Sequence, residues 1–184
     1  MSTLTVANQL TLLRMLLIPA LVILVIYGAN GWALVVFIVA GMTDALDGVI
    51  ARWWSQPTSL GALLDPMADK LLLISTFVVL TIPSLDLPNR LPVWLTVLVI
   101  SRDVIIVVTV AIVNLSLGRR IFSPTMLGKI ATLIYVVTAS LTLCFNWLDR
   151  SSILVDAAIY AAAAITIISG LHYISHVTRA LSEG

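Results

Sequence analysis

Six long apolar stretches, separated by short polar breaks, run along the 184 residues of the chain. They cover residues 10–27, 32–51, 62–82, 91–115, 126–148 and 153–174. A helix needs about 20 mostly apolar residues to cross the hydrocarbon of a bilayer. Each stretch has about that length, so the pattern predicts six transmembrane helices.

The breaks between these stretches carry residues that end helices. Residues 28–31 read Gly-Ala-Asn-Gly and predict a tight turn. Residues 55–58 form a polar loop, and residues 83–92 hold three prolines. No internal repeat divides the sequence. We therefore predict an all-α integral membrane protein, a six-transmembrane-helix bundle in which residues 1–184 form a single domain.

Composition supports a membrane setting. Hydrophobic residues make up 60% of the chain and charged residues 10%, whereas a soluble domain carries about 25% charged residues. Residues 1–8 lack the basic start of a cleavable signal peptide, so we expect the first apolar stretch to remain as a membrane helix. The single cysteine excludes an internal disulfide and a cysteine-based metal site.

Positive charges divide unevenly between the two predicted membrane faces. With a cytoplasmic N-terminus, six basic residues lie at or near the inner face, and Arg90 and Arg150 lie at the outer one. The six are Arg14, Arg52, Arg119, Arg120, Lys129 and Arg179. Basic residues concentrate on the cytoplasmic side of membrane proteins. We therefore expect both termini to face the cytoplasm.

Four of the nine acidic residues lie between positions 44 and 69, at the inner ends of the second and third apolar stretches. They are Asp44, Asp47, Asp65 and Asp69. Residues three or four apart share a helix face, so each pair points one way, and antiparallel helices would bring the pairs together. Like charges near a membrane need compensation. Carboxylates without cysteine or histidine favour Mg²⁺, Mn²⁺ or Ca²⁺, bound in a polar cleft that faces the cytoplasm.

Small residues accompany the aspartates at helical spacing. Gly48 lies one turn from Asp44, Ala51 one turn from Asp47, and Gly61 one turn before Asp65. Their lack of bulk allows a ligand or a helix to approach closely. Arg52 continues the same helix face, where its guanidinium can hold a phosphate oxygen.

The combined pattern is Asp-x-x-Asp-Gly-x-x-Ala-Arg over residues 44–52, followed by Gly-x-x-x-Asp-x-x-x-Asp over residues 61–69. It resembles the signature of the CDP-alcohol phosphatidyltransferase family, with each defining position present. The run from Asp65 to Lys70 is similar to bacterial phosphatidylglycerophosphate synthases and CMP-forming cardiolipin synthases. A looser likeness covers the Asn8-x-Leu-Thr-x-x-Arg14 opening and the segment from Gly128 to Thr132.

The resemblance implies a reaction and roles for these residues. A phosphatidyl group moves from CDP-diacylglycerol to an alcohol, and CMP leaves. Asp44, Asp47 and Asp65 are then ligands of Mg²⁺ or Mn²⁺, two ions per site, and Asp69 is the general base that also touches metal. Gly48, Ala51, Arg52 and Gly61 shape the CDP-lipid pocket. The likeness further implies a homodimer in the bacterial inner membrane, among membrane lipids and without a nucleic-acid partner.

A second charged set offers an acceptor site. Arg102 lies within the fourth apolar stretch, Arg119 and Arg120 after it, and Lys129 at the start of the fifth. An arginine at membrane depth indicates a functional site, and these cations suit a phosphate-bearing acceptor. Plainer roles stay open: an Arg102–Asp103 pair, topology signals at Arg119 and Arg120, and a headgroup contact at Lys129.

Two questions about the function stay open, the acceptor alcohol and the class of protein. We favour glycerol 3-phosphate as the acceptor, which yields phosphatidylglycerophosphate, over phosphatidylglycerol, which yields cardiolipin. Membrane carboxylates also mark the ion paths of divalent-ion or proton transporters. A transporter would place them near the bilayer midplane on repeated elements, whereas here they cluster at one end of two neighbouring stretches.

Overall fold

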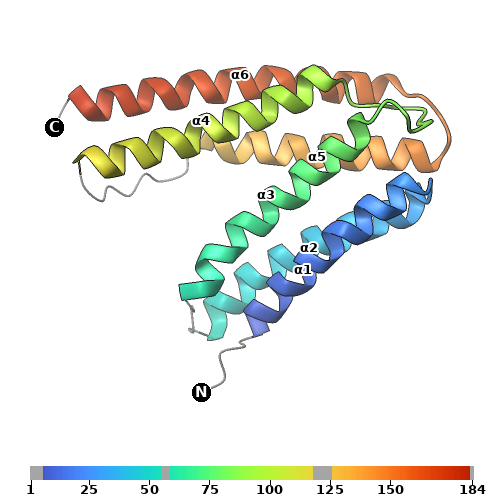
Figure 1. Ribbon diagram of the computed structural model, residues 1–184, viewed down its shortest axis with the longest axis horizontal. Coiled ribbons are helices and arrows are strands. Elements are labelled where there is room, and N and C mark those ends of the chain that lie inside the picture. The colour runs from blue at the N-terminus through green and yellow to red at the C-terminus, as the bar shows by residue number, and fades with distance from the viewer. Residues whose placement is uncertain (1–5, 55–58, 118–125, 183–184) are drawn as a thin grey trace. The chain divides into compact units, whose positions relative to one another are not determined.

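The protein is all-helical in the residues that the structure describes. This computed structural model describes residues 6–54, 59–117 and 126–182, without the side chains of residues 6–8, 44–54, 59–66, 111, 114–117 and 176–182. Six helices follow one another along the chain (Figure 1). They are α1 (Val6–Ile26), α2 (Asn30–Trp54), α3 (Ser59–Thr81), α4 (Val93–Leu117), α5 (Met126–Trp147) and α6 (Ile153–Ser182).

The helices confirm the positions of the six predicted stretches, while the number of six membrane crossings stays a prediction, and one boundary is a correction. The first five helices begin and end within about four residues of the predicted limits. The sixth was expected to end at residue 174, but α6 continues to Ser182. Its last residues are largely polar, so the apolar pattern ends before the helix does.

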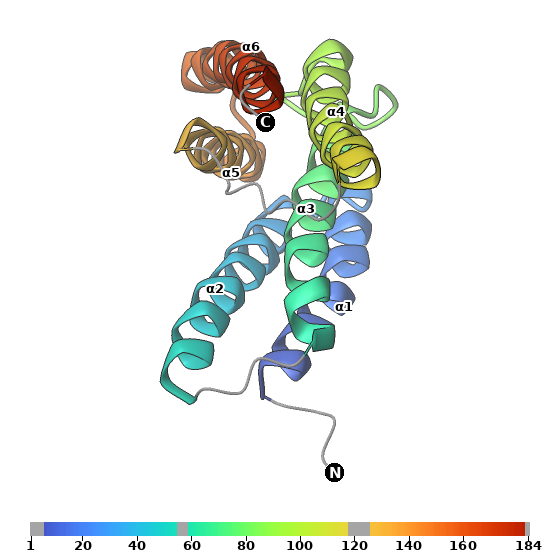
Figure 2. The same ribbon diagram turned by 90° about the vertical axis from the view of Figure 1, so that its left-hand side faces the viewer.

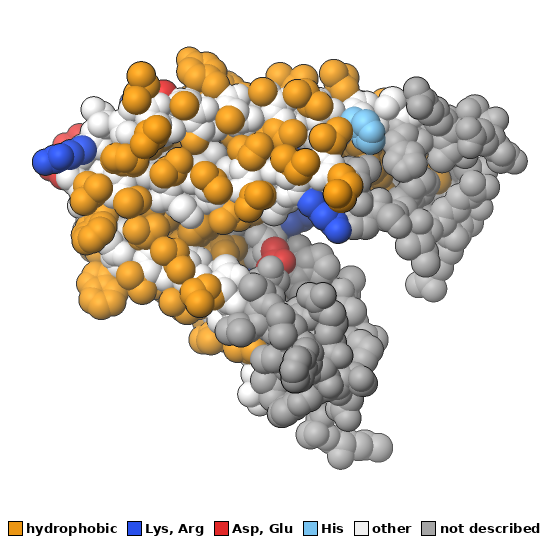
Figure 3. Space-filling view, turned by 180° about the vertical axis from the view of Figure 1, so that it is seen from behind, with side chains coloured by type: hydrophobic (Ala, Val, Ile, Leu, Met, Phe, Trp, Pro, Cys, Tyr) orange, Lys and Arg blue, Asp and Glu red, His pale blue; other side chains and the backbone are white. Residues whose placement is uncertain are grey.

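Four helices in the described residues are long and apolar enough to cross a membrane. The spans are Gln9–Ile26, Val93–Val110, Met126–Trp147 and Ile153–Ser175, and Asn30–Thr43 of α2 is a shorter apolar stretch. Large apolar side chains such as Leu16, Leu133 and Ile153 are exposed, and they cover much of the described surface (Figure 3). A surface of this kind belongs in lipid, as expected for an integral membrane protein.

The chain divides into two compact units. Unit 1 comprises Met1–Arg90 and Ala139–Ser151, and unit 2 comprises Leu91–Thr138 and Ser152–Gly184. In unit 1, α1, α2 and α3 pack together as neighbours, with α1 against both of the others (Figure 2). Small and apolar side chains fill this bundle. The buried ones include Leu21, Val25, Ala33, Phe37, Ala40, Ala68, Leu72, Phe77 and Leu80.

Unit 2 is held together by apolar packing and by hydrogen bonds between helices. The Tyr135 hydroxyl of α5 lies 2.7 Å from Thr166 Oγ1 of α6, and both residues are buried. The Thr138 hydroxyl donates to the Ala158 carbonyl at 3.3 Å. Tyr173 of α6 packs with Val113 of α4. Hydrogen bonds of this type join helices where no water is present to compete.

Candidate functional site

Helices α2 and α3 bring the aspartate positions to the same end of unit 1. Asp44 lies ten residues before the end of α2, and Asp69 lies ten residues after the start of α3. Asp47 and Asp65 lie seven and six residues from the same helix ends. At 1.5 Å per residue, the positions fall at levels of about 15 Å and about 10 Å from those ends. The two packed helices therefore carry the four positions at matching heights.

Several predicted site residues cannot be described further. The side chains of Asp44, Asp47, Gly48, Ala51, Arg52, Gly61 and Asp65 lie outside the described part of the structure, and so do Arg119 and Arg120 entirely. Among the described side chains, no three His, Cys, Asp or Glu residues gather into a metal site. The donor set in the sequence consists of carboxylates, which are the ligands that Mg²⁺ and Mn²⁺ prefer.

Asp69 forms an ion pair with an arginine of the first helix. Arg14 Nη1 donates to Asp69 Oδ1 at 2.5 Å, which joins α1 to α3. The Arg14 side chain is 0% exposed and the Asp69 side chain 38%. A hydrogen bond between two charged groups is short and about twice as strong as a neutral one. The arginine thus fixes the carboxylate from the protein side and leaves the carboxylate partly open.

Arg14 reaches Asp69 because α1 presents a polar stripe to the bundle. Thr11 and Arg14 are three residues apart, share a helix face, and are both fully buried. On α3, Ala68 is fully buried beside Asp69 and offers little bulk. The charge count places Arg14 at the inner face, where a long basic side chain can extend to the lipid headgroups. Its burial excludes such a headgroup contact.

Unit 2 holds the described part of the second charged set. Arg102 Nη1 donates to Asp103 Oδ1 at 2.8 Å, and the two side chains are 11% and 18% exposed. The adjacent residues therefore do pair, as the plainer of the two interpretations expected. Arg102 also lies close to α6, because a Cβ added at Gly170 would come within 3.7 Å of the arginine Cγ. Lys129, near the start of α5, is exposed.

Unit 1 contains a neutral hydrogen-bond network that the sequence did not reveal. Asn146 Oδ1 accepts from the Asn89 backbone N–H at 2.8 Å and from the Asn89 carboxamide at 3.2 Å. The Asn146 carboxamide donates to the Asn89 carbonyl at 3.0 Å, and Asn89 Nδ2 donates to the Arg150 carbonyl at 2.7 Å. The two asparagines are 57 residues apart, and no local pattern marks them as partners.

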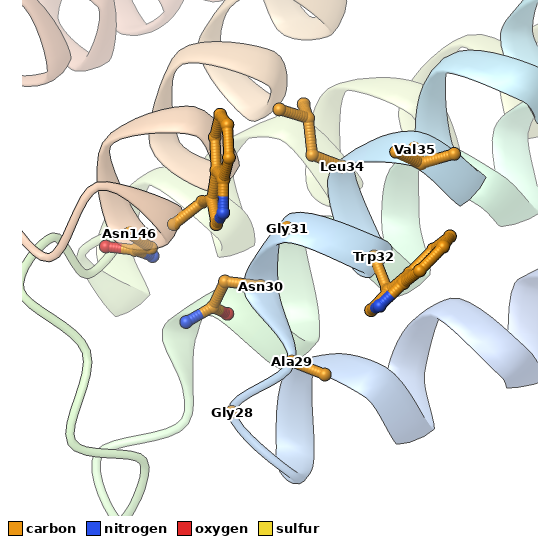
Figure 4. A pocket seen from close by; sticks show the side chains of 9 residues that line it. Gly28, Ala29, Asn30, Gly31, Trp32, Leu34, Val35 and Asn146 are labelled. Atoms are coloured by element: carbon orange, nitrogen blue, oxygen red, sulfur yellow. The ribbon is translucent and has the colours of Figure 1, made fainter.

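A pocket lies at the same end of unit 1 as this asparagine network. It has a volume of about 460 Å³ and is lined by the start of α2 and by Asn146 and Trp147 of α5 (Figure 4). Asn30, at the start of α2, is on the opposite end of its helix from the aspartates. Asn30 and Asp44 are 14 residues apart, or about 21 Å along α2. The pocket is therefore separate from the aspartate positions.

Comparison with known proteins shows to which family the chain belongs. The profile of the CDP-alcohol phosphatidyltransferase family matches residues 4–170. The chain belongs to the CDP-alcohol phosphatidyltransferase family. This confirms the resemblance drawn from the aspartate motif, and the matched stretch includes both Arg14 and Asp69.

Individual relatives fall into two groups by name. A CMP-forming cardiolipin synthase of Streptomyces coelicolor is 39% identical over 138 residues, 70% of this chain and 60% of that protein. A probable phosphatidylglycerophosphate synthase of Mycobacterium tuberculosis is 33% identical over 184 residues, 94% of this chain and 81% of that protein. The human CMP-forming cardiolipin synthase is 35% identical, over 53% of its length. The match thus spans less than two thirds of either cardiolipin synthase.

Proposed function

We propose that this chain transfers a phosphatidyl group from CDP-diacylglycerol to an alcohol and releases CMP. The observation that carries the proposal is the ion pair between the buried Arg14 and the partly exposed Asp69, the last aspartate of the motif, in a chain that the family profile matches over residues 4–170. A partly exposed carboxylate held by a fully buried arginine suits a group that must meet a substrate in a fixed orientation. The relatives named above are synthases, which gives no support to the transporter alternative.

In the reaction, the acceptor hydroxyl oxygen attacks the phosphorus that carries the diacylglycerol. The new oxygen–phosphorus bond forms, the bond to CMP breaks, and the hydroxyl proton passes to the Asp69 carboxylate. General-base assistance of this kind contributes about 10²- to 10⁴-fold to rate. Mg²⁺ or Mn²⁺, held by Asp44, Asp47 and Asp65, would neutralise charge on the diphosphate. Gly48, Ala51, Arg52 and Gly61 would line the CDP-lipid pocket.

We propose glycerol 3-phosphate as the acceptor, with phosphatidylglycerol as the second candidate. The probable phosphatidylglycerophosphate synthase matches 94% of this chain and 81% of its own length, a fuller match than either cardiolipin synthase gives. Arg102, Arg119, Arg120 and Lys129 would bind the acceptor phosphate. The nearly buried Arg102 is held by Asp103, so it would act as a fixed positive charge. The site would face the cytoplasm of a bacterial inner membrane, in a homodimer.

The test is CMP release by purified protein from CDP-diacylglycerol with Mg²⁺. Glycerol 3-phosphate and phosphatidylglycerol are compared as acceptors at equal concentration. We expect release with glycerol 3-phosphate and the appearance of phosphatidylglycerophosphate in the lipid extract. Release with phosphatidylglycerol alone would instead establish cardiolipin synthesis, and release with neither alcohol would refute both acceptors.

A further inference from the structure

Two pockets adjoin at the end of unit 1 that lies opposite the aspartates. The first is the pocket of about 460 Å³ in Figure 4, and the second has a volume of about 520 Å³ and reaches the loop after α3. Four residues line both pockets, which therefore meet there: Gly28, Asn30, Asn146 and Trp147. Pockets of this size bind small ligands, and a lipid headgroup has similar dimensions.

Aromatic and apolar side chains place the first pocket at the membrane surface. Trp32 and Trp147 line it and are 69% and 60% exposed, as is typical of tryptophans at the level of the headgroups. Leu34 and Val35 line the same pocket further along α2, where they offer an apolar path to an acyl chain. The Trp147 indole lies directly on α2, because a Cβ added at Gly31 would be 2.6 Å from the indole Cδ1. Close packing of α2 and α5 thus forms this wall.

Asn30 has hydrogen-bonding capacity that the described residues do not use. Its Oδ1 is buried and accepts no hydrogen bond from them. A buried oxygen without a donor costs free energy, and a half-turn about the Cβ–Cγ bond would exchange it with Nδ2. Figure 4 shows this side chain on the side of the pocket where Asn146 lies. A ligand that carries a hydrogen-bond donor would therefore be stabilised here.

The charges around the two pockets suit a headgroup that carries both signs. The charged residues that line the second pocket are acidic, and Asp149 among them is exposed. Asp149 has a φ of 50°, which glycine adopts more readily, so its retention indicates a use for the carboxylate. The first hydrogen bond of α2 runs from the Ala33 N–H to the Ala29 carbonyl. The N–H groups of residues 30–32 precede this bond and favour an anion.

We propose that these pockets bind a phospholipid with a primary ammonium headgroup, in the membrane leaflet opposite the aspartates. The ammonium group donates to Asn30 Oδ1 and to the Asp149 carboxylate, while the phosphate lies at the start of α2. An acyl chain follows Leu34 and Val35. The proposal does not depend on the proposed function, because the pockets are separate from the aspartate positions.

The choice between two lipid headgroups separates the hydrogen bonds from the charge. A primary ammonium has three N–H donors, whereas a trimethylammonium group has the same charge and no donor. Native mass spectrometry of the purified protein in detergent measures the binding. Phosphatidylethanolamine, phosphatidylcholine and phosphatidylglycerol with identical acyl chains are added at equal concentration. We expect phosphatidylethanolamine to bind about tenfold more tightly than either of the others. Equal binding of phosphatidylethanolamine and phosphatidylcholine, or tighter binding of phosphatidylglycerol, would overturn the proposal.

Asp149→Asn removes the charge and keeps the shape of the side chain, and asparagine tolerates the same backbone conformation. The dissociation constant for phosphatidylethanolamine should rise by about tenfold. Asp156→Asn, at an exposed aspartate in the first turn of α6, is the matched control and should leave lipid binding unchanged. An equal loss in the two variants would mean that the lipid does not bind at Asp149.

Asn30→Leu tests the second contact by itself. Leucine is close to asparagine in size but accepts no hydrogen bond, so affinity for phosphatidylethanolamine should fall by about fivefold. Affinity for phosphatidylcholine should stay the same, because that lipid donates no hydrogen bond to Asn30. If Asn30→Leu fails to fold, Asp149→Asn decides the question. An undiminished preference for phosphatidylethanolamine in the variants that fold would refute the site.

Discussion

The two ends of unit 1 bury their polar groups by different chemistry. At the aspartate end, a fully buried arginine is bonded to a carboxylate that stays partly exposed. At the other end, Asn89 and Asn146 are 7% and 4% exposed and bond to each other through both their side chains and the Asn89 backbone. The aspartate end thus contains an ion pair whose carboxylate is accessible, and the other end contains two buried neutral carboxamides that bond to each other.

The difference indicates which end is specialised for chemistry and which for stability. A satisfied neutral hydrogen bond contributes about 1 kcal/mol to folding, and a buried group left without its bond costs about 1–3 kcal/mol. The hydrogen bonds of the amide network join protein groups to one another, and a carboxamide does not take up a proton near neutral pH. An accessible carboxylate near a membrane does not stabilise the fold in this way, so its presence indicates that it binds a substrate or a cation.

The largest expected effect is on turnover at the charged end. Asp69→Asn removes the base but keeps the shape of the side chain, so CMP release should fall by about 10²- to 10⁴-fold while CDP-diacylglycerol still binds. Binding and release are measured on the same preparation. Asp86→Asn, at an exposed aspartate in the loop after α3, is the control and should keep full activity. A near-normal rate in Asp69→Asn would remove the base assignment.

The next effect is on stability at the amide end. Asn146→Leu removes the acceptor of the Asn89 backbone N–H and the donor to the Asn89 carbonyl, which should cost about 2–4 kcal/mol, while the Asn89 carboxamide keeps its bond to the Arg150 carbonyl. Thermal unfolding in detergent would report the loss, and turnover per folded molecule should stay near the wild-type value. Thr109→Ala serves as the control, because that hydroxyl bonds the Ile105 carbonyl of its own helix. An unchanged melting temperature in Asn146→Leu would contradict the structural role.

These two regions differ in how far the sequence predicts them. The six helices follow from apolar length alone, and Asp69 follows from the spacing of a motif over residues 44–69. The pairing of Arg14 with Asp69 cannot be predicted from the sequence, because the two residues are 55 positions apart. An arginine that extends to the lipid headgroups would have the same neighbours in the sequence as Arg14. The Asn89–Asn146 network is hidden for the same reason. The polar end of α6 was missed because the prediction followed apolar length, and the apolar pattern stops before the helix does.

A smaller effect concerns the acceptor and extends the comparison to a charge outside unit 1. Lys129→Ala removes a cation that we assign to the acceptor phosphate, so KM for glycerol 3-phosphate should rise by about tenfold. KM for CDP-diacylglycerol should stay the same, as steady-state kinetics with one substrate varied at a time would show. An unchanged acceptor KM would leave Lys129 as a headgroup contact.

The smallest effect concerns two helix ends at the amide end of unit 1. Gly28 and Asp149 both adopt positive φ, at 73° and 50°. Each follows a helix and donates to a carbonyl of its last turn, Gly28 to Val25 at 3.0 Å and Asp149 to Asn146 at 3.2 Å. Glycine adopts this conformation without strain. Asp149→Gly should therefore stabilise the protein by up to about 1 kcal/mol, and Gly28→Ala should destabilise it by about 1–2 kcal/mol. Thermal unfolding of the two variants should show shifts of opposite sign, and shifts of equal sign would contradict this account.

The central claim is that the aspartate end performs metal-dependent phosphatidyl transfer. The most direct measurement follows CMP release from CDP-diacylglycerol and glycerol 3-phosphate before chelation, after chelation with EDTA, and after Mg²⁺ or Mn²⁺ is restored. Helix content is recorded at each step. We predict that release stops on chelation and returns with the added metal, while the helix content stays constant. Release that persists without divalent metal would contradict the account.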